Sequence, residues 1–381
     1  MLEIFLNQKP LYYDEIDYER MPKIYNKLKE HLKLPKIIHL IGTNGKGTTG
    51  RFLASALYSK GFSVGHYTSP HIINFNERVW INNRDASSED LEEAHTKLLT
   101  LLSDEDSKAL SYFEYTTLLA MVMFESLEYV VLEAGLGGEH DATAVFPKIM
   151  TLVTPIDIDH EAFLGDTLEK ITTTKLNAIK NIAILGTQKN NEVYTTAKNI
   201  ERKNSVQIFK VEDFLRDKDY KKIETIAENL TLAPYLTQNL QLAISALNFL
   251  KIEYSIKDFK NSKLFGRVTP LNKNILIDVG HNILASQAIA NSCQGEKYIL
   301  IYNSYKDKNY KEIVNILKPI VRWVELIDIE DDRIEDSSIL SKVVSDLGLD
   351  VKKFVKVQEN EKYLVFGSFK VVEEFLKIYN G

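Results

Sequence analysis

The sequence has little of what extracellular, membrane-spanning or nucleic-acid-binding proteins need. Its one cysteine, Cys293, excludes a disulfide framework and a metal cluster built on cysteine. No apolar run approaches the ~20 residues of a membrane-spanning helix, and residues 1–7 do not resemble a signal peptide. The net charge of -6 offers no basic surface to nucleic acid. We therefore expect a cytoplasmic protein, acting as a monomer on small molecules, with no membrane or nucleic-acid partner.

The order of apolar segments indicates an α/β protein. The 381 residues are enough for two domains with real cores. Strand-like runs alternate with helical patterns, and this favours a mostly parallel sheet covered by helices. The first such runs are 36–41, 129–132, 150–153 and 182–185. The alternation restarts after residue 265, which predicts domains at 1–265 and 266–381 and a hinge within 262–270.

A glycine-rich segment between a predicted strand and a predicted helix is the strongest local signal. It reads Gly42-Thr43-Asn44-Gly45-Lys46-Gly47-Thr48, and the helix is expected from Thr49 to Lys60. Glycines let the backbone curl so that N–H groups point inward, and a helix N-terminus favours an anion. Lys46 would neutralise phosphate charge, and Thr48 offers a hydroxyl near a metal. The segment predicts a phosphate-binding loop for a nucleotide.

Polar residues follow several of the other predicted strands. Ser69 and Pro70 follow one strand, Glu133 ends the next, and Asp159-His160 follows a third. Ligands of α/β sheets bind beyond the carboxyl ends of parallel strands. An oxygen ligand such as Glu133 suits Mg2+, which is a hard cation. Glu133 is therefore a candidate ligand of a magnesium ion.

The loop and the segments after it resemble the folylpolyglutamate synthase/dihydrofolate synthase family, a branch of the Mur ligase superfamily. The resemblance runs in order from residue 42 to residue 281 and beyond. It implies a P-loop ATPase domain followed by a smaller, Rossmann-like glutamate-ligase domain. It also implies an ATP-dependent carbon–nitrogen ligase that adds L-glutamate to dihydropteroate or folate through an acyl phosphate.

The same resemblance implies metal and catalytic roles for particular residues. The implied metal ligands are Ser69, Glu133 and His160, with Thr48 beside them. Lys175 matches a lysine that is carbamylated in the family and helps to hold a second Mg2+. The resemblance thus implies one or two Mg2+ ions, and it gives catalytic roles to Lys46, His160, Lys175 and His281.

Nucleotide contacts are implied beyond the phosphate loop. The segment Leu236 to Ala243 resembles a family segment in which Gln241 takes the place of a nucleotide-contacting Asn. Gly266-Arg267 resembles a hinge motif whose arginine reaches the ATP phosphates. Asp278 and His281 resemble a motif of the second domain in which the aspartate contacts the nucleotide.

Substrate contacts are implied at two sites. Tyr112-Phe113-Glu114 resembles the family segment that binds the pteridine, and an aromatic ring with a carboxylate suits a flat heterocycle bearing N–H groups. His140-Asp141-Ala142 occupies a second pterin-contact position. Residues 16–20 correspond to a third more loosely.

The chain departs from the family pattern at three positions. Glu139 stands where the family usually has Arg, Ala144 where it has Asn, and Thr174 where it has Glu. The charge reversal at Glu139 bears on loop contacts and substrate preference, and it leaves Glu133 untouched.

Two other functions fit parts of the pattern. A Mur-type ligase would share the machinery, but such enzymes need a further N-terminal domain, and the phosphate loop already begins at residue 42. A P-loop ATPase that switches between partners would hydrolyse ATP without regard to pterins or glutamate. The ligase assignment leaves open whether the chain performs one or both glutamate additions.

Overall fold

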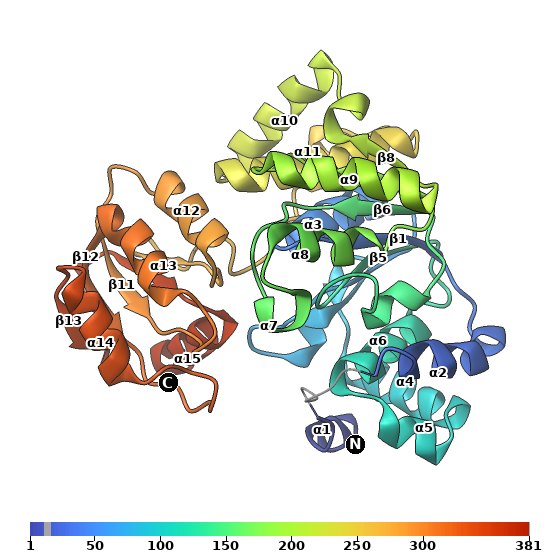
Figure 1. The fold of residues 1–381 in the computed structure, drawn as a ribbon, viewed down its shortest axis with the longest axis horizontal. Helices are drawn as coiled ribbons and strands as arrows, with labels where there is room; N and C mark the ends of the chain where they lie inside the picture. Colours follow the sequence, from blue (N-terminus) through green and yellow to red (C-terminus); the bar gives the residue numbers. More distant parts are fainter. Residues whose placement is uncertain (11–16, 381) are drawn as a thin grey trace. The chain divides into compact units, whose positions relative to one another are not determined.

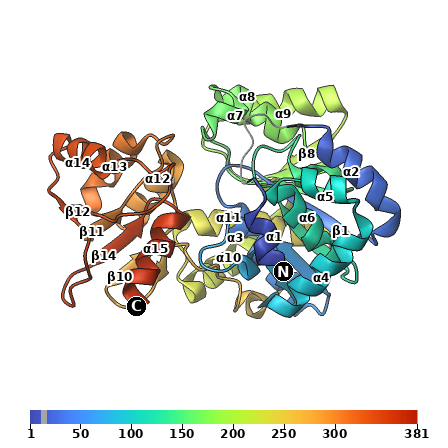
Figure 2. The same ribbon diagram turned by 90° about the horizontal axis from the view of Figure 1, so that it is seen from below.

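The chain forms two compact units. The structure is a computed structural model that describes residues 1–10 and 17–380. Unit 1 comprises residues 1–230 and 236–262, and unit 2 comprises residues 231–235 and 263–381. The main boundary between the units falls at 262/263. Figures 1 and 2 show the elements of both units.

Unit 1 is built on an eight-stranded sheet. The strand order is β4-β3-β2-β5-β1-β6-β7-β8, parallel from β2 to β8, with β3 and β4 antiparallel at one edge. Central strands are buried on both faces, as parallel sheets require. The strands are β1 (Lys36–Ile41), β2 (Val64–Tyr67), β3 (Val79–Ile81), β4 (Arg84–Asp85), β5 (Tyr129–Glu133), β6 (Met150–Val153), β7 (Ile182–Leu185) and β8 (Gln207–Lys210).

Helices of unit 1 pack in groups that share apolar cores. One core joins α1, α2, α4 and α6 to β2 and β5, and Figure 1 shows these helices grouped together with α5. A second core joins α8 and α9 to β6 and β7. The helices are α1 (Leu2–Asn7), α2 (Arg20–Leu28), α3 (Lys46–Ser59), α4 (Ser88–Leu101), α5 (Asp104–Ala109), α6 (Tyr112–Met123), α7 (Glu161–Leu164), α8 (Leu168–Leu176), α9 (Asn191–Asn204), α10 (Asp217–Leu230) and α11 (Pro234–Phe249).

Unit 2 has a six-stranded sheet of order β13-β12-β11-β14-β10-β9, in which β9 alone runs antiparallel to its neighbour. Because β14 inserts between β10 and β11, the carboxyl ends of these three strands meet, which is where such sheets bind ligands. The elements are β9 (Thr269–Pro270), β10 (Ile275–Ile277), α12 (Ile283–Ser292), β11 (Tyr298–Tyr302), α13 (Tyr310–Leu317), β12 (Val321–Leu326), α14 (Ser337–Asp346), β13 (Val351–Lys353), β14 (Tyr363–Phe366) and α15 (Phe369–Asn380).

The mixed α/β architecture with two mostly parallel sheets confirms the fold class predicted from the sequence. One helix differs in its start, since α3 begins at Lys46 and not at Thr49, so the end of the glycine-rich segment is already helical. In the described part of the chain, no helix has the length and apolar character needed to cross a membrane.

Candidate functional site

The phosphate loop joins β1 to α3 and has two positions that only glycine fits. Gly42 has φ +141°, and a Cβ there would lie 2.0 Å from Oγ1 of Thr154. Gly45 has φ +90°, and a Cβ there would lie 2.4 Å from Oδ1 of Asn239. Positive φ strains other residues, so both the conformation and the close approach explain the glycines. The carbonyl of Pro155 accepts from the N–H groups of Thr43 (2.9 Å) and Asn44 (3.3 Å) and anchors the loop.

Lys46 curls over the loop that precedes it. Its Nζ donates to the carbonyls of Gly42 (3.2 Å) and Thr43 (3.3 Å) and lies 4.0 Å from Oε1 of Glu133. Thr48 stands in the first turn of α3, and its buried hydroxyl has no hydrogen-bond partner among residues 1–10 and 17–380. A cation, a helix N-terminus and an unpartnered hydroxyl at one place fit a nucleotide phosphate and its divalent cation.

Glu133 ends β5 at the sheet edge where the phosphate loop begins. The side-chain hydroxyl of Thr68, which follows β2, donates a short hydrogen bond to Oε2 of Glu133. Ser69 comes next in the chain, so the structure brings the Ser69 and Glu133 segments together beside Lys46. This adjacency follows from the parallel pairing of β2, β5 and β1, whose carboxyl ends share one edge.

Lys175 reaches the phosphate loop from α8. Its side chain is almost completely buried, and Nζ donates to the carbonyl of Gly42 at 3.0 Å. Burial and, to a lesser extent, the charge of Lys46 lower the pKa of Lys175 to about 7, while Asp159 and Asp141 oppose the shift. A substantial fraction of such an amine is neutral near neutral pH.

His160 immediately precedes α7 and has a left-handed φ of 54°, and its N–H donates to Oδ1 of Asp159 at 2.9 Å. The hydroxyl of Thr43 in the phosphate loop donates to the carbonyl of Asp157 (3.0 Å) and accepts from its N–H (3.1 Å), so this segment adjoins the loop. Across residues 1–10 and 17–380, no cluster of three or more His, Cys, Asp or Glu side chains could hold a metal. A metal at this edge therefore needs hydroxyl ligands, such as those of Ser69 and Thr48, beside Glu133 and His160.

Asp141 holds the glycine-rich turn after Glu133 in place. Its carboxylate accepts from the N–H groups of Gly135 (2.9 Å), Leu136 (2.9 Å) and Thr143 (2.9 Å) and from the hydroxyl of Thr143 (2.5 Å). Both oxygens are thus used within its own loop. The structure gives Asp141 a positioning role within its own loop.

Replacing Asp141 with alanine is expected to destabilise the protein by about 2–4 kcal/mol, because it leaves several donors in a buried turn without an acceptor. The free energy of unfolding, from urea titration followed by circular dichroism, measures this loss. Asp166→Ala is a control, since that carboxylate is exposed and pairs only with Lys170 in the next turn. Equal stability of the two variants would contradict the role assigned to Asp141.

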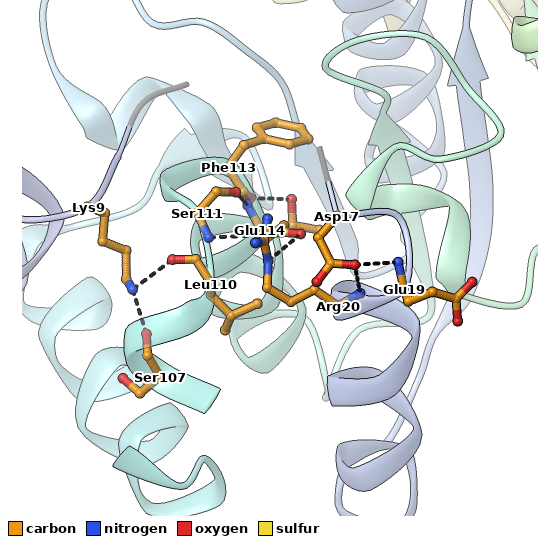
Figure 3. A network of polar contacts seen from close by, with 10 residues as sticks. Lys9, Asp17, Glu19, Arg20, Ser107, Leu110, Ser111, Phe113 and Glu114 are labelled. Atoms are coloured by element: carbon orange, nitrogen blue, oxygen red, sulfur yellow. Dashed lines mark hydrogen bonds and ion pairs between the residues drawn. The ribbon is translucent and has the colours of Figure 1, made fainter. Parts of the chain in front are cut away.

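Glu114 is fixed at the start of α6 by Arg20, which is distant in sequence, and by Ser111, the N-cap of the same helix. Its carboxylate accepts from Nε of Arg20 (2.9 Å and 3.2 Å) and from the N–H of Ser111 (2.7 Å). Figure 3 shows Arg20 and Lys9 converging on this region, where Lys9 donates to the carbonyls of Ser107 (2.5 Å) and Leu110 (2.9 Å). The carboxylate of Glu114, which is expected to bind the substrate, is therefore held in place by Arg20 from the N-terminal part of the chain.

Aromatic side chains surround the other expected substrate positions. Phe113 packs so closely on Gly135 that a Cβ there would lie 2.6 Å from the ring. The ring of Tyr18 lies 4.2 Å from that of His140, which places residues 17–20 beside the 140–142 segment. Within residues 16–20, which were loosely predicted to contact the pterin, Tyr18 and Arg20 lie against the other predicted substrate-binding residues. Residue 16 lies outside the described residues.

The residue of α11 that faces the phosphate loop is Asn239. Its side-chain amide packs against Gly45, and its buried Nδ2 has no hydrogen-bond partner within the described part of the chain. Gln241, chosen from the sequence, lies two positions further on, and helical residues two apart point to different faces. Sequence reasoning missed Asn239 because the family pattern does not mark that position.

In unit 2, the buried carboxylate of Asp278, directly after β10, accepts several hydrogen bonds. It accepts from the N–H groups of Val268 (2.9 Å) and Gly280 (2.8 Å) and from the hydroxyl of Tyr235 (3.0 Å). Burial raises the pKa of Asp278, and the charge of Arg267 opposes the rise.

Arg267 is positioned by its own surroundings in unit 2. Nη1 donates to the carbonyl of Gly266 at 3.0 Å, and the guanidinium lies 5.1 Å from the centre of the Phe369 ring. Nδ1 of His281 lies 3.3 Å from the carbonyl of Val279. The structure therefore brings Arg267 and Asp278 together, with His281 three residues further along the chain.

The departures from the family pattern have local partners. Glu139 accepts from the side-chain amide of Asn177 at 2.7 Å and lies 3.9 Å from Nε2 of His140. Its backbone N–H donates to the carbonyl of Thr174 at 3.0 Å. The carbonyl of Ala144 accepts from Nζ of Lys148 at 3.0 Å. The carboxylate of Glu139 thus contacts Asn177, directly after α8, and the neighbouring His140.

The sheet and its loop define an α/β protein of the phosphate-loop type, and comparisons with known proteins narrow this class. No model of a known protein family matches the chain. A dihydrofolate synthase/folylpolyglutamate synthase of Buchnera aphidicola subsp. Baizongia pistaciae is 31% identical over 382 residues, covering 90% of this chain and 86% of that protein.

Solved structures that resemble this chain come from proteins of the same name. The crystal structure of Helicobacter pylori folylpolyglutamate synthetase is 37% identical, with a TM-score of 0.82 over 100% of this chain and 98% of that chain. A Yersinia pestis bifunctional folylpolyglutamate synthase/dihydrofolate synthase, complexed with AMPPNP and Mn ion, shares the fold at 22% identity, with a TM-score of 0.81 over 99% and 96% of the chains. The chain belongs to the dihydrofolate synthase/folylpolyglutamate synthase family.

Proposed function

We propose that the chain is an ATP- and Mg2+-dependent ligase that adds L-glutamate to dihydropteroate, to folates, or to both. The observation that carries this proposal is the placement of Lys46 and Glu133 at one edge of a parallel sheet, beside an unpartnered Thr48 hydroxyl. Membership of the family supports it, since the related proteins are named for these two activities. The Yersinia pestis structure, with AMPPNP and Mn ion, supports ATP and a divalent metal as the cofactors.

The reaction needs activation because a carboxylate oxygen is a poor leaving group. A carboxylate oxygen of the pteroate attacks the γ-phosphorus of ATP, ADP leaves, and an acyl phosphate forms. The glutamate amine then attacks the acyl carbon, loses a proton, and phosphate departs with the original carboxylate oxygen. The amide product, ADP and phosphate account for all atoms of the substrates.

The side chains at the sheet edge have separate tasks in this scheme. Lys46 and the first turn of α3 bind the phosphates and stabilise charge that develops on the transferred group. Ser69, Glu133, His160 and Thr48 would hold Mg2+, which supplies further charge neutralisation when bound. Phe113, Glu114, His140 and Ala142 would contact the pterin, with Tyr112 beside them. Gln241, Arg267, Asp278 and His281 stay proposed contacts of the nucleotide or glutamate.

The proposal is tested by offering dihydropteroate and tetrahydrofolate separately with glutamate and MgATP, and weighing the products. A mass increase of one glutamyl residue with equimolar ADP is the expected result for at least one acid. Product from both acids identifies a bifunctional enzyme. ADP formation that ignores pterin and glutamate would instead support an ATPase switch, and activity on a nucleotide-linked sugar acid would support a Mur-type ligase.

We further propose that Lys175 is carbamylated and helps to hold a second Mg2+. Only a neutral amine reacts with CO2, and burial lowers the pKa of Lys175 to about 7. Lys175→Ala is expected to lower kcat by about 100-fold or more, since an anionic metal ligand is lost. Short carboxylates such as formate or acetate should restore part of the activity by occupying the same space.

The pKa of Lys175 also predicts how carbamylation depends on pH. At a fixed concentration of dissolved CO2, enzyme depleted of CO2 should regain activity at a rate that rises with pH, with a midpoint near 7. The sign follows because deprotonation produces the reactive amine. Unchanged activity of Lys175→Ala, or no rescue by any short carboxylate, would refute the carbamate.

Size-exclusion chromatography tests the proposed monomeric state.

A further inference from the structure

The side-chain amide of Gln188 joins the segment that follows β6 to the segment that follows β7. Gln188 is buried, with 7% of its surface exposed. Its Oε1 accepts from the N–H of Ile156 at 2.8 Å, and its Nε2 donates to the carbonyls of Gly186 (2.9 Å) and Thr154 (3.3 Å). All three hydrogen bonds go to backbone groups, so one amide ties the ends of two neighbouring strands together.

The two groups of the first segment that Gln188 holds lie on either side of Pro155. The carbonyl of Pro155 accepts from the N–H groups of Thr43 (2.9 Å) and Asn44 (3.3 Å) and so anchors the phosphate loop. Proline has no N–H through which its own position could be fixed. The place of this carbonyl therefore depends on the backbone before and after it, which the amide of Gln188 holds on both sides.

The same segment has further contacts that transmit the position of Gln188. The backbone of Asp157 exchanges two hydrogen bonds with the hydroxyl of Thr43, at 3.0 and 3.1 Å, and His160 follows three residues later. On the other side, the backbone N–H of Gln188 donates to the hydroxyl of Tyr194 in α9 at 2.9 Å. A continuous set of hydrogen bonds thus runs from α9 through Gln188 to the phosphate loop.

We propose that Gln188 is a positioning residue for nucleotide binding, because its amide fixes the segment that anchors the phosphate loop. This inference rests on the proposed ATP-dependent function, and it adds a residue that acts through the backbone of residues 154–156. A phosphate cradle binds its anion through N–H groups that point inward, so its affinity depends on where the loop is held. A buried amide whose hydrogen bonds are satisfied is well suited to hold it.

Replacing Gln188 with methionine tests the proposal, since methionine has a similar length and forms none of the three hydrogen bonds. The affinity of the intact protein for MgADP, measured by calorimetry, is expected to fall at least tenfold, which corresponds to about 1.4 kcal/mol. The KM for glutamate in the ligase assay should stay within about twofold of the unaltered value, because the loss is confined to the nucleotide.

Asn248→Leu is the matched control for the loss of an amide in unit 1. Nδ2 of Asn248 donates to the carbonyl of Phe214 at 2.8 Å. Asn248 lies nine positions beyond Asn239 in α11, or about 13.5 Å along the helix from the residue that packs against the phosphate loop. The control should lower the free energy of unfolding, because a carbonyl loses its partner, and leave the affinity for MgADP unchanged.

Tyr194→Phe is a milder variant that keeps the test decisive if Gln188→Met does not fold. It removes only the hydroxyl that accepts from the N–H of Gln188, and it should weaken MgADP binding by about threefold. Unchanged MgADP affinity in Gln188→Met, or in Tyr194→Phe if that is the variant that folds, would overturn the inference. Equal losses in Gln188→Met and Asn248→Leu would also overturn it, since both amides would then be merely structural.

Failure of the ligase function would give a different result. The unaltered protein would then form no glutamyl product from any pteroate, while the comparison of MgADP affinities between Gln188→Met and the unaltered protein would still report on the phosphate loop.

Discussion

Replacing Lys46 with alanine is expected to abolish turnover. The ammonium group donates to the carbonyls of Gly42 and Thr43 and lies 4.0 Å from Oε1 of Glu133. Loss of one such charge at the transferred phosphoryl group should lower kcat by about 1,000-fold. ADP release with dihydropteroate, glutamate and MgATP measures the change.

Two controls separate chemistry from folding in this experiment. Lys170→Ala removes an exposed lysine that pairs only with Asp166 in the same turn region, and it should retain full activity. Circular dichroism and thermal unfolding of Lys46→Ala should match the unaltered protein, because Lys46 begins α3 and its side chain donates to carbonyls of the adjoining loop, outside the apolar cores. ATP-dependent ligation that persists in Lys46→Ala would refute the role of the loop.

Replacing Glu133 with glutamine is the second change with a large expected effect. Glutamine keeps the shape of the side chain and an acceptor for the Thr68 hydroxyl, and it removes the negative charge at the end of β5. Since hard divalent cations bind through charged oxygen ligands, the apparent affinity for Mg2+ should fall by about 100-fold. Raising the metal concentration should restore part of the activity.

The matched control is Glu139→Gln, six residues further along the same turn. Glu139 accepts a hydrogen bond from Asn177 and faces His140, so its loss should leave the metal dependence unchanged. Activity titrated with Mn2+ or Mg2+ gives the half-saturating concentration of each variant. The same half-saturating concentration for Glu133→Gln and the unaltered protein would exclude Glu133 as a metal ligand.

Much of unit 1 was predictable because its central strands are continuous apolar runs. The strands at 36–41, 150–153 and 182–185 occur at the predicted bounds, since strands buried on both faces leave a clear signal. The phosphate loop was predictable for a related reason. Glycines at 42 and 45 reflect local backbone geometry, which the sequence records directly.

Contacts between distant segments were not predictable in the same way. The approach of Arg20 to Glu114 joins residues 94 positions apart, and no local pattern encodes it. The charged stretch at 213–232 hides α10, because Asp219 is buried and accepts from the hydroxyl of Tyr254 (2.7 Å), which breaks the apolar pattern of the helix. Asn239 was not predicted because its contact with the phosphate loop depends on how α11 packs against that loop.

The central claim is that the substrate carboxylate is activated by phosphorylation and then joined to glutamate. Dihydropteroate labelled with 18O in its carboxylate tests this claim when it is incubated with the protein, glutamate and MgATP. One labelled oxygen should appear in each phosphate released, because the acyl phosphate passes that oxygen to phosphorus. Phosphate that carries no label while ADP accumulates would show that ATP is hydrolysed by water, and the claim would be wrong.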